Sequence, residues 1–156
     1  MTEAAREYRY VVDRDGRIFH DGSEIVDPAV LRFFLRAMTR TDGGRWLVLC
    51  QGERNWFAAP DTPFVVQRLR LSLEGSALQA VELCFQGDYR EPLDPATVET
   101  ERGLLFCRIR GGTFRARFGR VAVQQIAPFL MDVGEGPALV MSGRRHPVRS
   151  GGERPS

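Results

Sequence analysis

The chain has 156 residues, of which 43% are hydrophobic and 27% charged. This balance excludes the low-hydrophobicity, high-charge composition of disordered chains. The length is close to the commonest domain size and predicts one domain with a single core, over residues 1–142. The chain has 22 basic and 20 acidic residues, and the formal net charge of +2 argues against a dedicated nucleic-acid binder.

Every basic residue is arginine, and two explanations fit this bias. The planar fork of arginine binds carboxylate and phosphate in bidentate fashion, where lysine offers a point charge. A GC-rich genome that avoids lysine codons gives the same bias, and the arginines are spread along the whole chain. The segment 143–156 is rich in Gly, Arg, Pro and Ser and is predicted to be a disordered basic tail of charge +3, which leaves the body at −1.

Three cysteines, Cys50, Cys84 and Cys107, lie singly in apolar runs without C-x-x-C spacing. They are predicted to be buried thiols in a reducing compartment. The only histidines are His20 and His146, so the sequence predicts no metal site, and no motif indicates a cofactor. The first seven residues are polar and no segment reaches the roughly 18 apolar residues of a membrane span, so a cytoplasmic protein without a membrane partner is expected.

Turn and cap residues predict the elements of the first fifty residues. Strands over 8–13 and 17–20 flank Asp15-Gly16, and a glycine after an aspartate between two such runs is a hairpin signal. Asp27-Pro28 supplies an N-cap and a first-turn proline, after which apolar residues recur at helical spacing. This helix is predicted to end at 42–44, an Asp-Gly-Gly turn, and 46–50 is predicted to be a buried strand.

The rest of the chain is predicted to be mainly sheet. Strand-like runs cover 54–58, 64–73 and 78–85, and a proline-containing loop follows. The C-terminal third repeats the N-terminal order, with a hairpin over 104–118, a helix over about 119–131 that Pro128 ends or kinks, and a strand over 138–142. We therefore predict an α+β fold, mainly antiparallel sheet with two helices, and the repeated order suggests two ββαβ units joined by central strands.

One polar cluster stands among these apolar strands. Strand alternation places Arg54 and Trp56 on one face, with Glu53 and Asn55 on the other. Arginine beside tryptophan suits an anionic or aromatic ligand. The hypothetical ligand-binding residues are therefore Glu53, Arg54, Asn55, Trp56, Asp61 and Thr62. The alternative is structural, with the charged side chains paired to neighbours and the short polar ones bonded to turn backbone.

Arginine also occupies every other position in three strand-like runs. If the faces that carry these side chains coincide, six guanidinium groups line one surface that could hold phosphates or an acidic partner. The alternative is a solvated sheet face, because outward polar residues alternate in any antiparallel sheet. The hypothetical anion patch comprises Arg68, Arg70, Arg108, Arg110, Arg115 and Arg117.

Catalytic templates are missing from the sequence. There is no G-x-S-x-G, H-E-x-x-H, Walker A or G-x-G-x-x-G motif, and no spacing singles out a pair of carboxylates. We therefore assign no catalytic residue, and nothing requires an enzyme.

Several motifs resemble two families without an assigned biochemical role. The ordered motifs are Glu7-Tyr8-Arg9-Tyr10, Asp15-Gly16-Arg17-Ile18-Phe19, the Phe33-Phe34 helix, the 52–57 run and Asp61-Thr62-Pro63-Phe64-Val65-Val66. Together they resemble the uncharacterised protein family 0598, small proteins with mitochondrial members in animals. The 61–66 segment, with the preceding hairpin and helix, is also similar to a bacterial domain of unknown function. That second resemblance implies an α+β fold built from repeated motifs and a proposed part in signalling.

Three functions stay open on the sequence. The first is a non-catalytic binding or regulatory module that recognises a small anionic ligand or a protein partner through the 53–61 region. The second is an enzyme for a small acidic or phosphorylated substrate, with Glu53 as acid or base and Arg54 as anion anchor. The third is weak nucleic-acid binding through the arginine-rich sheet face. The sequence leaves the oligomeric state open.

Overall fold

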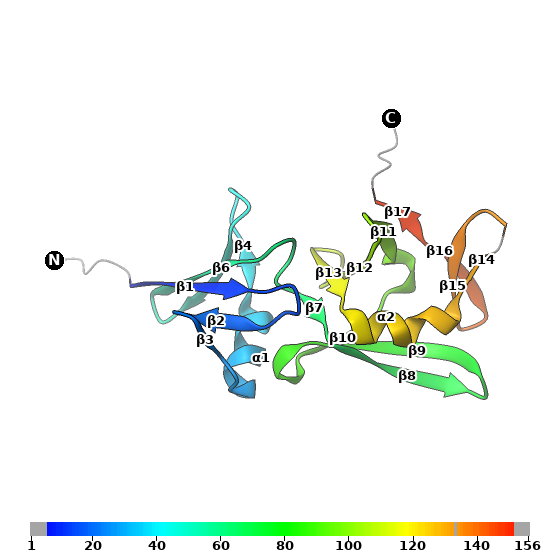
Figure 1. Cartoon of the computed structure of the whole chain (residues 1–156), viewed down its shortest axis with the longest axis horizontal. Coiled ribbons are helices and arrows are strands. Elements are labelled where there is room, and N and C mark those ends of the chain that lie inside the picture. Colours follow the sequence, from blue (N-terminus) through cyan, green and yellow to red (C-terminus); the bar gives the residue numbers. More distant parts are fainter. Residues whose placement is uncertain (1–5, 133, 152–156) are drawn as a thin grey trace. The chain divides into compact units, whose positions relative to one another are not determined.

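A computed structural model describes residues 6–132 and 134–151 (Figure 1). The chain divides into two compact units. Unit 1 is the chain up to Pro63 together with Gln86–Tyr89, and unit 2 is Phe64–Phe85 together with the chain from Arg90. The chain therefore passes from one unit to the other three times. Both units are mixtures of helix and sheet, which confirms the α+β class.

Unit 1 is built on one six-stranded sheet of order β3-β2-β1-β6-β5-β4. All neighbouring strands in it are antiparallel except β1 and β6, which are parallel and pair Glu7 with Arg54 through Val11 with Ala58. A parallel pair needs a long connection, and here it contains helix α1 and the four strands β2 to β5. The strands are β1 (Glu7–Val12), β2 (Ile18–His20), β3 (Ser23–Glu24), β4 (Thr39–Arg40), β5 (Trp46–Cys50) and β6 (Glu53–Ala58).

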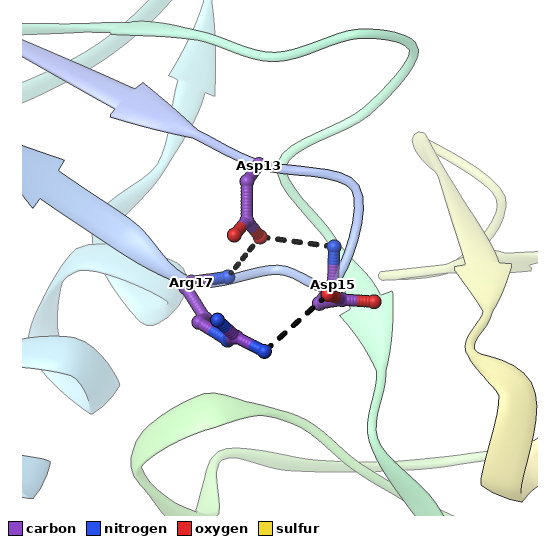
Figure 2. A network of polar contacts seen from close by, with 3 residues as sticks. All are labelled: Asp13, Asp15 and Arg17. Carbon is purple, nitrogen blue, oxygen red and sulfur yellow. Dashed lines mark hydrogen bonds and ion pairs between the residues drawn. The ribbon is translucent and has the colours of Figure 1, made fainter.

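The predicted Asp-Gly hairpin is present between β1 and β2, and a side chain stabilises its turn (Figure 2). One carboxylate oxygen of Asp13 accepts the backbone N–H groups of Asp15 and Arg17, each at 2.9 Å. Gly16 closes the turn at φ 85°, a left-handed conformation that glycine adopts without a steric penalty. Arg17 and Asp15 add an exposed ion pair of 3.5 Å, which contributes little to stability.

Helix α1 (Pro28–Ala37) covers one face of this sheet. It begins as predicted, because the Asp27 carboxylate accepts the N–H of Ala29 at 2.9 Å and proline occupies the first turn. Its buried side chains are Leu31, Phe34 and Leu35, and Phe34 packs against the rings of sheet residues 10 and 57 at 5.1 Å between centroids. The 3₁₀ turn η1 (Gln86–Asp88) returns the chain to unit 1 and packs against α1.

Unit 2 contains three smaller sheets, of orders β10-β9-β8, β17-β11-β12-β13-β7 and β14-β15-β16. Antiparallel pairs dominate them, and β13–β7 and β11–β17 are parallel. The strands are β7 (Val65–Val66), β8 (Arg68–Glu74), β9 (Ala77–Cys84), β10 (Arg90–Pro92), β11 (Glu99–Glu101), β12 (Leu104–Ile109), β13 (Phe114–Phe118), β14 (Leu130–Asp132), β15 (Pro137–Met141), β16 (Arg144–Pro147) and β17 (Arg149–Ser150). Two 3₁₀ turns, η2 (Pro95–Thr97) and η3 (Ala127–Phe129), complete the unit.

Helix α2 (Arg120–Ile126) is held to strand β8 through one amide side chain. Gln125 accepts the N–H of Leu69 at 2.7 Å and donates to the Leu69 carbonyl at 3.0 Å. An additional strand would otherwise form hydrogen bonds with these two backbone groups. Leu69 is only 4% exposed, and the glutamine side chain supplies the hydrogen bonds that its N–H and carbonyl need at the edge of the sheet. Pro128 ends this helix as predicted, because α2 stops at Ile126 and the 3₁₀ turn η3 follows.

We expect Gln125→Ala to lower the free energy of unfolding by about 1 to 3 kcal/mol, because it removes the partners of both Leu69 backbone groups. Chemical denaturation monitored by far-UV circular dichroism measures this loss. Gln124→Ala is the matched control, since Gln124 is the exposed neighbour on the same helix and should change stability by less than about 0.5 kcal/mol. Equal effects of the two substitutions would show that the contact with Leu69 does not stabilise the fold.

Two details of the helices and sheets differ from the prediction. Helix α1 ends at Ala37 rather than at the Asp-Gly-Gly turn, because residues 39–40 pair with β5 as strand β4. The element order of the two predicted ββαβ units recurs, but their pairing does not: β5 belongs to the sheet of its hairpin, whereas β15 lies in a different sheet from β12 and β13. The ββαβ units are therefore not confirmed.

The predicted disordered tail is wrong for the residues that the structure describes. Residues 144–147 form β16, which pairs with β15, and 149–150 form β17, which pairs with β11. Burial of apolar partners such as Leu139 and Val98 beside these strands outweighs the loop-forming composition. Residues 152–156 lie outside the described part of the chain. The single domain over residues 1–142 stays a prediction, because two units of one chain can still unfold cooperatively.

The cysteines follow the prediction in part. Cys84 and Cys107 are buried, whereas Cys50 is only half-buried at the end of β5. Burial raises the pKa of the Cys107 thiol to about 12, with the nearby carboxylates Glu91 and Glu99 acting in the same direction. This thiol is therefore protonated at neutral pH. Within the described residues, no helix is long and apolar enough to cross a membrane.

Candidate functional site

A cavity of about 420 Å³ opens in unit 1, near the C-terminal ends of β1 and β6 and the N-terminal end of β5. Its walls combine three arginines, four aromatic side chains, three small residues and one carboxylate. The lining consists of Arg9, Arg40, Arg45, Tyr10, Trp46, Trp56, Phe57, Gly44, Ala58, Ala59 and Asp61. We call this cavity the Arg–Trp pocket.

A tight turn between β4 and β5 supplies two of the three arginines. The Thr41 N–H donates to the carbonyl of Arg45 at 2.8 Å, and the Thr41 hydroxyl accepts the Arg45 N–H at 3.1 Å. Gly44 adopts φ +82° within the turn, and a Cβ there would stand 3.7 Å from the Arg40 guanidinium. The turn thus brings Arg40 and Arg45, which lie at its two ends, to the same pocket.

Each of these arginines rests on a tryptophan. The guanidinium carbon of Arg45 lies 3.7 Å from the centroid of the Trp56 ring, and that of Arg40 lies 5.0 Å from the Trp46 ring. Arg40 also donates from Nε to the carbonyl of Gly44 at 3.2 Å. Cation–π contact and this hydrogen bond restrict the side chains before any ligand arrives, which lowers the entropy that binding would lose.

The parallel pairing of β1 with β6 supplies the third arginine. Arg9 lies directly opposite Trp56 in this register, so the two residues share one face of the sheet. Among the described residues, the guanidinium groups of Arg9, Arg40 and Arg45 form no ion pair with a carboxylate. The three are exposed, and their charge is available to an anion.

The positive charge of the pocket is local. Three arginines against one aspartate, Asp61, leave the lining with a formal charge of +2. The sequence of unit 1 as a whole has nine arginines against eleven acidic residues, a net charge of −2. A positive site in a negative surrounding attracts a small anion and repels an extended polyanion.

A buried hydrogen-bond chain supports the pocket from below. Asn55 is 5% exposed, accepts the Tyr10 hydroxyl at 3.2 Å and donates to the Val48 carbonyl at 3.1 Å. The Tyr10 ring stacks on Phe57 at 4.9 Å between centroids. Burial raises the pKa of the Tyr10 phenol, with Tyr8 and Glu53 acting in the same direction, so the group stays a neutral donor at physiological pH.

The structure places two of the six predicted ligand-binding residues, Trp56 and Asp61, in the lining. Asn55 is in the buried chain beneath it, and Thr62 is 2% exposed beside Asp61, whose carboxylate accepts its N–H at 2.7 Å. Glu53 and Arg54 lie at the other end of β6 and do not line the cavity. Arg54 pairs with Glu7 at 3.6 Å, as the structural alternative predicted.

The six arginines of the predicted anion patch do not form one row. Arg68 and Arg70 lie in the β10-β9-β8 sheet, and the other four lie on or beside β12 and β13. Several of them form ion pairs with carboxylates. Arg70 pairs with Glu82 at 3.7 Å, Arg110 pairs with Glu91 at 3.7 Å, and Arg115 pairs with both Glu99 and Glu101. Arg117 is only 9% exposed. The patch as a binding surface stays a prediction that this geometry does not favour.

Sequence reasoning missed Arg9, Arg40 and Arg45. Two of them precede an aromatic residue directly, as Arg9-Tyr10 and Arg45-Trp46, and this Arg–aromatic pairing was the available signal. Arg9 joins the lining through the parallel β1–β6 pairing across more than forty residues, which no local pattern indicates.

No family model matches the sequence. The fold, however, is similar to two solved bacterial structures, both of proteins of the DUF1285 family. One, from Silicibacter pomeroyi DSS-3, superimposes with a TM-score of 0.69 at 17% sequence identity, covering 93% of this chain and 83% of the other. The second, from Shewanella baltica OS155, gives a TM-score of 0.60 at 9% identity, covering 76% of this chain and 90% of the other.

At these identities the likeness concerns the fold. The chain therefore shares its fold with bacterial proteins of a domain family of unknown function, in agreement with the second resemblance drawn from the 61–66 segment. The resemblance to the family with mitochondrial members in animals stays a prediction.

Proposed function

We propose that this protein is a binding module whose Arg–Trp pocket takes up a small anionic ligand. The observation that carries the proposal is that three arginines without carboxylate partners among the described residues line one cavity of about 420 Å³. Arginine is the side chain best suited to hold carboxylate or phosphate groups in bidentate fashion. The size lies within the range of small-molecule sites, and the aromatic walls would cover an apolar part of the ligand.

The positions of Glu53 and Arg54, the two residues proposed from the sequence for a reaction, favour binding over catalysis. Arg54 is held by Glu7, and Glu53 lies at the start of β6, away from the cavity at the end of that strand. The pocket itself contains one carboxylate, Asp61, beside its arginines. A regulatory role, in which the bound anion changes the affinity for a protein partner, is compatible with this site.

A thermal-shift screen tests the proposal directly. The panel contains succinate, citrate, phthalate, ribose 5-phosphate and nucleoside monophosphates. A ligand present at a hundred times its dissociation constant adds about 2.7 kcal/mol, which raises the melting temperature of a chain this size by roughly 5 to 10 °C. We expect such a shift with at least one of these anions.

Arginine variants locate the binding. Arg40→Ala and Arg45→Ala should each weaken the affinity about tenfold or more, because a hydrogen bond to a charged group is worth roughly 1.5 to 3 kcal/mol. Arg54→Ala is the matched control: it removes an arginine from the same sheet but outside the cavity, and it should leave the affinity nearly unchanged. Loss of binding in Arg54→Ala alone would move the site to the 53–54 pair and contradict the proposal.

A further inference from the structure

The six-stranded sheet of unit 1 buries one face and exposes the other. Successive side chains of a strand point to opposite faces, so Val48 is buried on the face that α1 covers, whereas Leu49 is 61% exposed on the opposite face. On β1, Val12 is buried and Val11 is 57% exposed. We call the side opposite to α1 the open face. A solvated sheet face ordinarily carries polar residues, and large exposed apolar side chains on it mark a site of interaction.

The apolar side chains of the open face form one continuous band. The register places Val11 opposite both Phe19 and Ala58, and it places Trp56 opposite Leu47. Neighbours two residues apart on one strand join these pairs, so the band crosses four adjacent strands diagonally, from β2 to β5. Strands lie about 4.8 Å apart and rise about 3.3 Å per residue, which makes the band roughly 20 Å long. The apolar band comprises Phe19, Val11, Ala58, Trp56, Leu47 and Leu49.

Two arginines flank the apolar band. Arg9 lies on β1 opposite Trp56, and Arg45, at the start of β5, places its guanidinium carbon 3.7 Å from the centroid of the same ring. Because β1 and β5 are the two neighbours of β6, these arginines lie on opposite sides of Trp56. Both are exposed, and within the described part of the chain neither forms an ion pair with a carboxylate. The band is therefore complementary to an apolar stripe that carboxylates border on both sides.

The geometry favours a helix as the occupant. The edge strands β3 and β4 have two residues each, which gives an added strand little backbone to pair with. A helix with one apolar stripe covers a sheet face, as α1 does on the other side, and about 13 helical residues span roughly 20 Å.

Charge distinguishes this occupant from two others. A second copy of the chain, packed face to face, would bring Arg9 and Arg45 of one copy toward those of the other, and like charges in an interface oppose association. An anionic membrane extends across the whole of unit 1, whose net charge is −2. A helix bordered by carboxylates meets the two arginines of the band alone.

We infer that the open face docks an amphipathic helix of a partner protein, with the apolar stripe of the helix on the band and its acidic residues beside Arg9 and Arg45. This interaction goes beyond the uptake of a small anion. Four residues of the band do not line the Arg–Trp pocket, so the two kinds of binding can be tested separately. These four are Val11, Phe19, Leu47 and Leu49.

Two synthetic peptides test the interface on the full chain. Each is an alanine-rich helix of about 16 residues with leucines along one stripe, which glutamate borders in one peptide and lysine in the other. Fluorescence anisotropy of the labelled peptides measures both affinities. We expect the glutamate peptide to bind at least tenfold more tightly, because lysine places like charge beside both arginines.

The indole N–H signals of the two tryptophans report the two faces in nuclear magnetic resonance spectra of the ¹⁵N-labelled protein. Trp56 belongs to the open face, whereas Trp46 is buried on the face that α1 covers. The glutamate peptide should shift the Trp56 signal and leave that of Trp46 nearly unchanged. Equal shifts of both signals would contradict docking on the open face.

Variants locate the contact. Val11→Thr combined with Leu49→Thr removes apolar surface but retains residues that suit a strand. This double variant should bind the glutamate peptide about tenfold more weakly and small anions unchanged. Leu73→Thr is the matched control, since Leu73 is 51% exposed on β8 of unit 2 and should affect neither affinity. Arg9→Ala should reduce the preference for the glutamate peptide to within about threefold, and circular dichroism melts verify that every variant is folded.

The outcomes separate this inference from the proposed function. Absence of glutamate-peptide binding at millimolar concentration, equal binding of the lysine peptide, or full affinity in the double variant overturns helix docking and leaves the small-anion site in place. Peptide binding without binding of any small anion contradicts the proposed function alone.

Two further measurements test the other occupants of the open face. Self-association in sedimentation equilibrium that the double variant abolishes would assign the face to a second copy of the chain. Binding to vesicles of phosphatidylserine and phosphatidylcholine that the double variant loses would assign it to a membrane. Either result overturns the partner helix.

Discussion

Gly87→Ala should destabilise the protein by roughly 2 to 5 kcal/mol. Gly87 has φ +68°, where a residue with a Cβ loses about 1 to 2 kcal/mol. The added Cβ would also stand 2.5 Å from the Arg32 backbone nitrogen, 2.6 Å from the Pro28 carbonyl oxygen and 2.9 Å from the Leu31 Cβ. Two of these contacts are with helix backbone that cannot yield, so overpacking adds a further 1 to 3 kcal/mol.

The loss appears as a melting temperature lowered by on the order of 10 °C. Tryptophan fluorescence follows it, because both tryptophans belong to unit 1, as does Gly87. Gly22→Ala is the matched control, since Gly22 also lies in unit 1 with φ +81° but has nothing within 4 Å of the added Cβ. Gly22→Ala should lose only the stability that a positive φ costs a residue with a Cβ, about 1 to 2 kcal/mol. If the two variants melt together, η1 does not pack against the first turn of α1 in solution.

Local signals in the sequence predict much of this fold. The Asp-Gly turn, the Asp27 cap with its proline, and Pro128 after α2 each act within four or five residues, and each has the predicted effect. The end of α1 was wrong because Thr39 and Arg40 gain strand partners in β5, a contact that helical spacing does not report. Tertiary pairing decided that boundary.

Two of the residues that line the candidate site were predicted from the sequence. Trp56 and Asp61 stood out as polar and aromatic residues among apolar strands, and both line the cavity. Arg54 carried the same signal but has Glu7 as a partner, because the parallel register places these two residues opposite each other. The same register brings Arg9 beside Trp56. One long-range pairing thus removed a predicted residue from the site and supplied a missed one.

Phe64→Ala should cost about 3 to 5 kcal/mol, the usual loss for a buried phenylalanine. Phe64 is fully buried in unit 2, stacks on Phe114 at 5.5 Å between centroids and meets Phe85 edge-on at 6.2 Å. The guanidinium of Arg110 covers the same ring at 5.3 Å. Removing the ring opens a cavity among groups that are held by their own strands and that therefore close only partly around it. Phe64→Leu keeps most of the volume and should lose less.

This variant also tests whether residues 1–142 behave as one domain. Far-UV circular dichroism reports both units, whereas the two tryptophans report unit 1 alone. Strands β9 and β10 pair Cys84 with Arg90, and the segment between them, Gln86–Tyr89, belongs to unit 1. Unfolding of that hairpin releases η1 from α1, so destabilising unit 2 should also destabilise unit 1. We expect both signals to shift to the same lower midpoint. A fluorescence midpoint that stays at the wild-type value while circular dichroism separates into two steps would show that the units unfold independently.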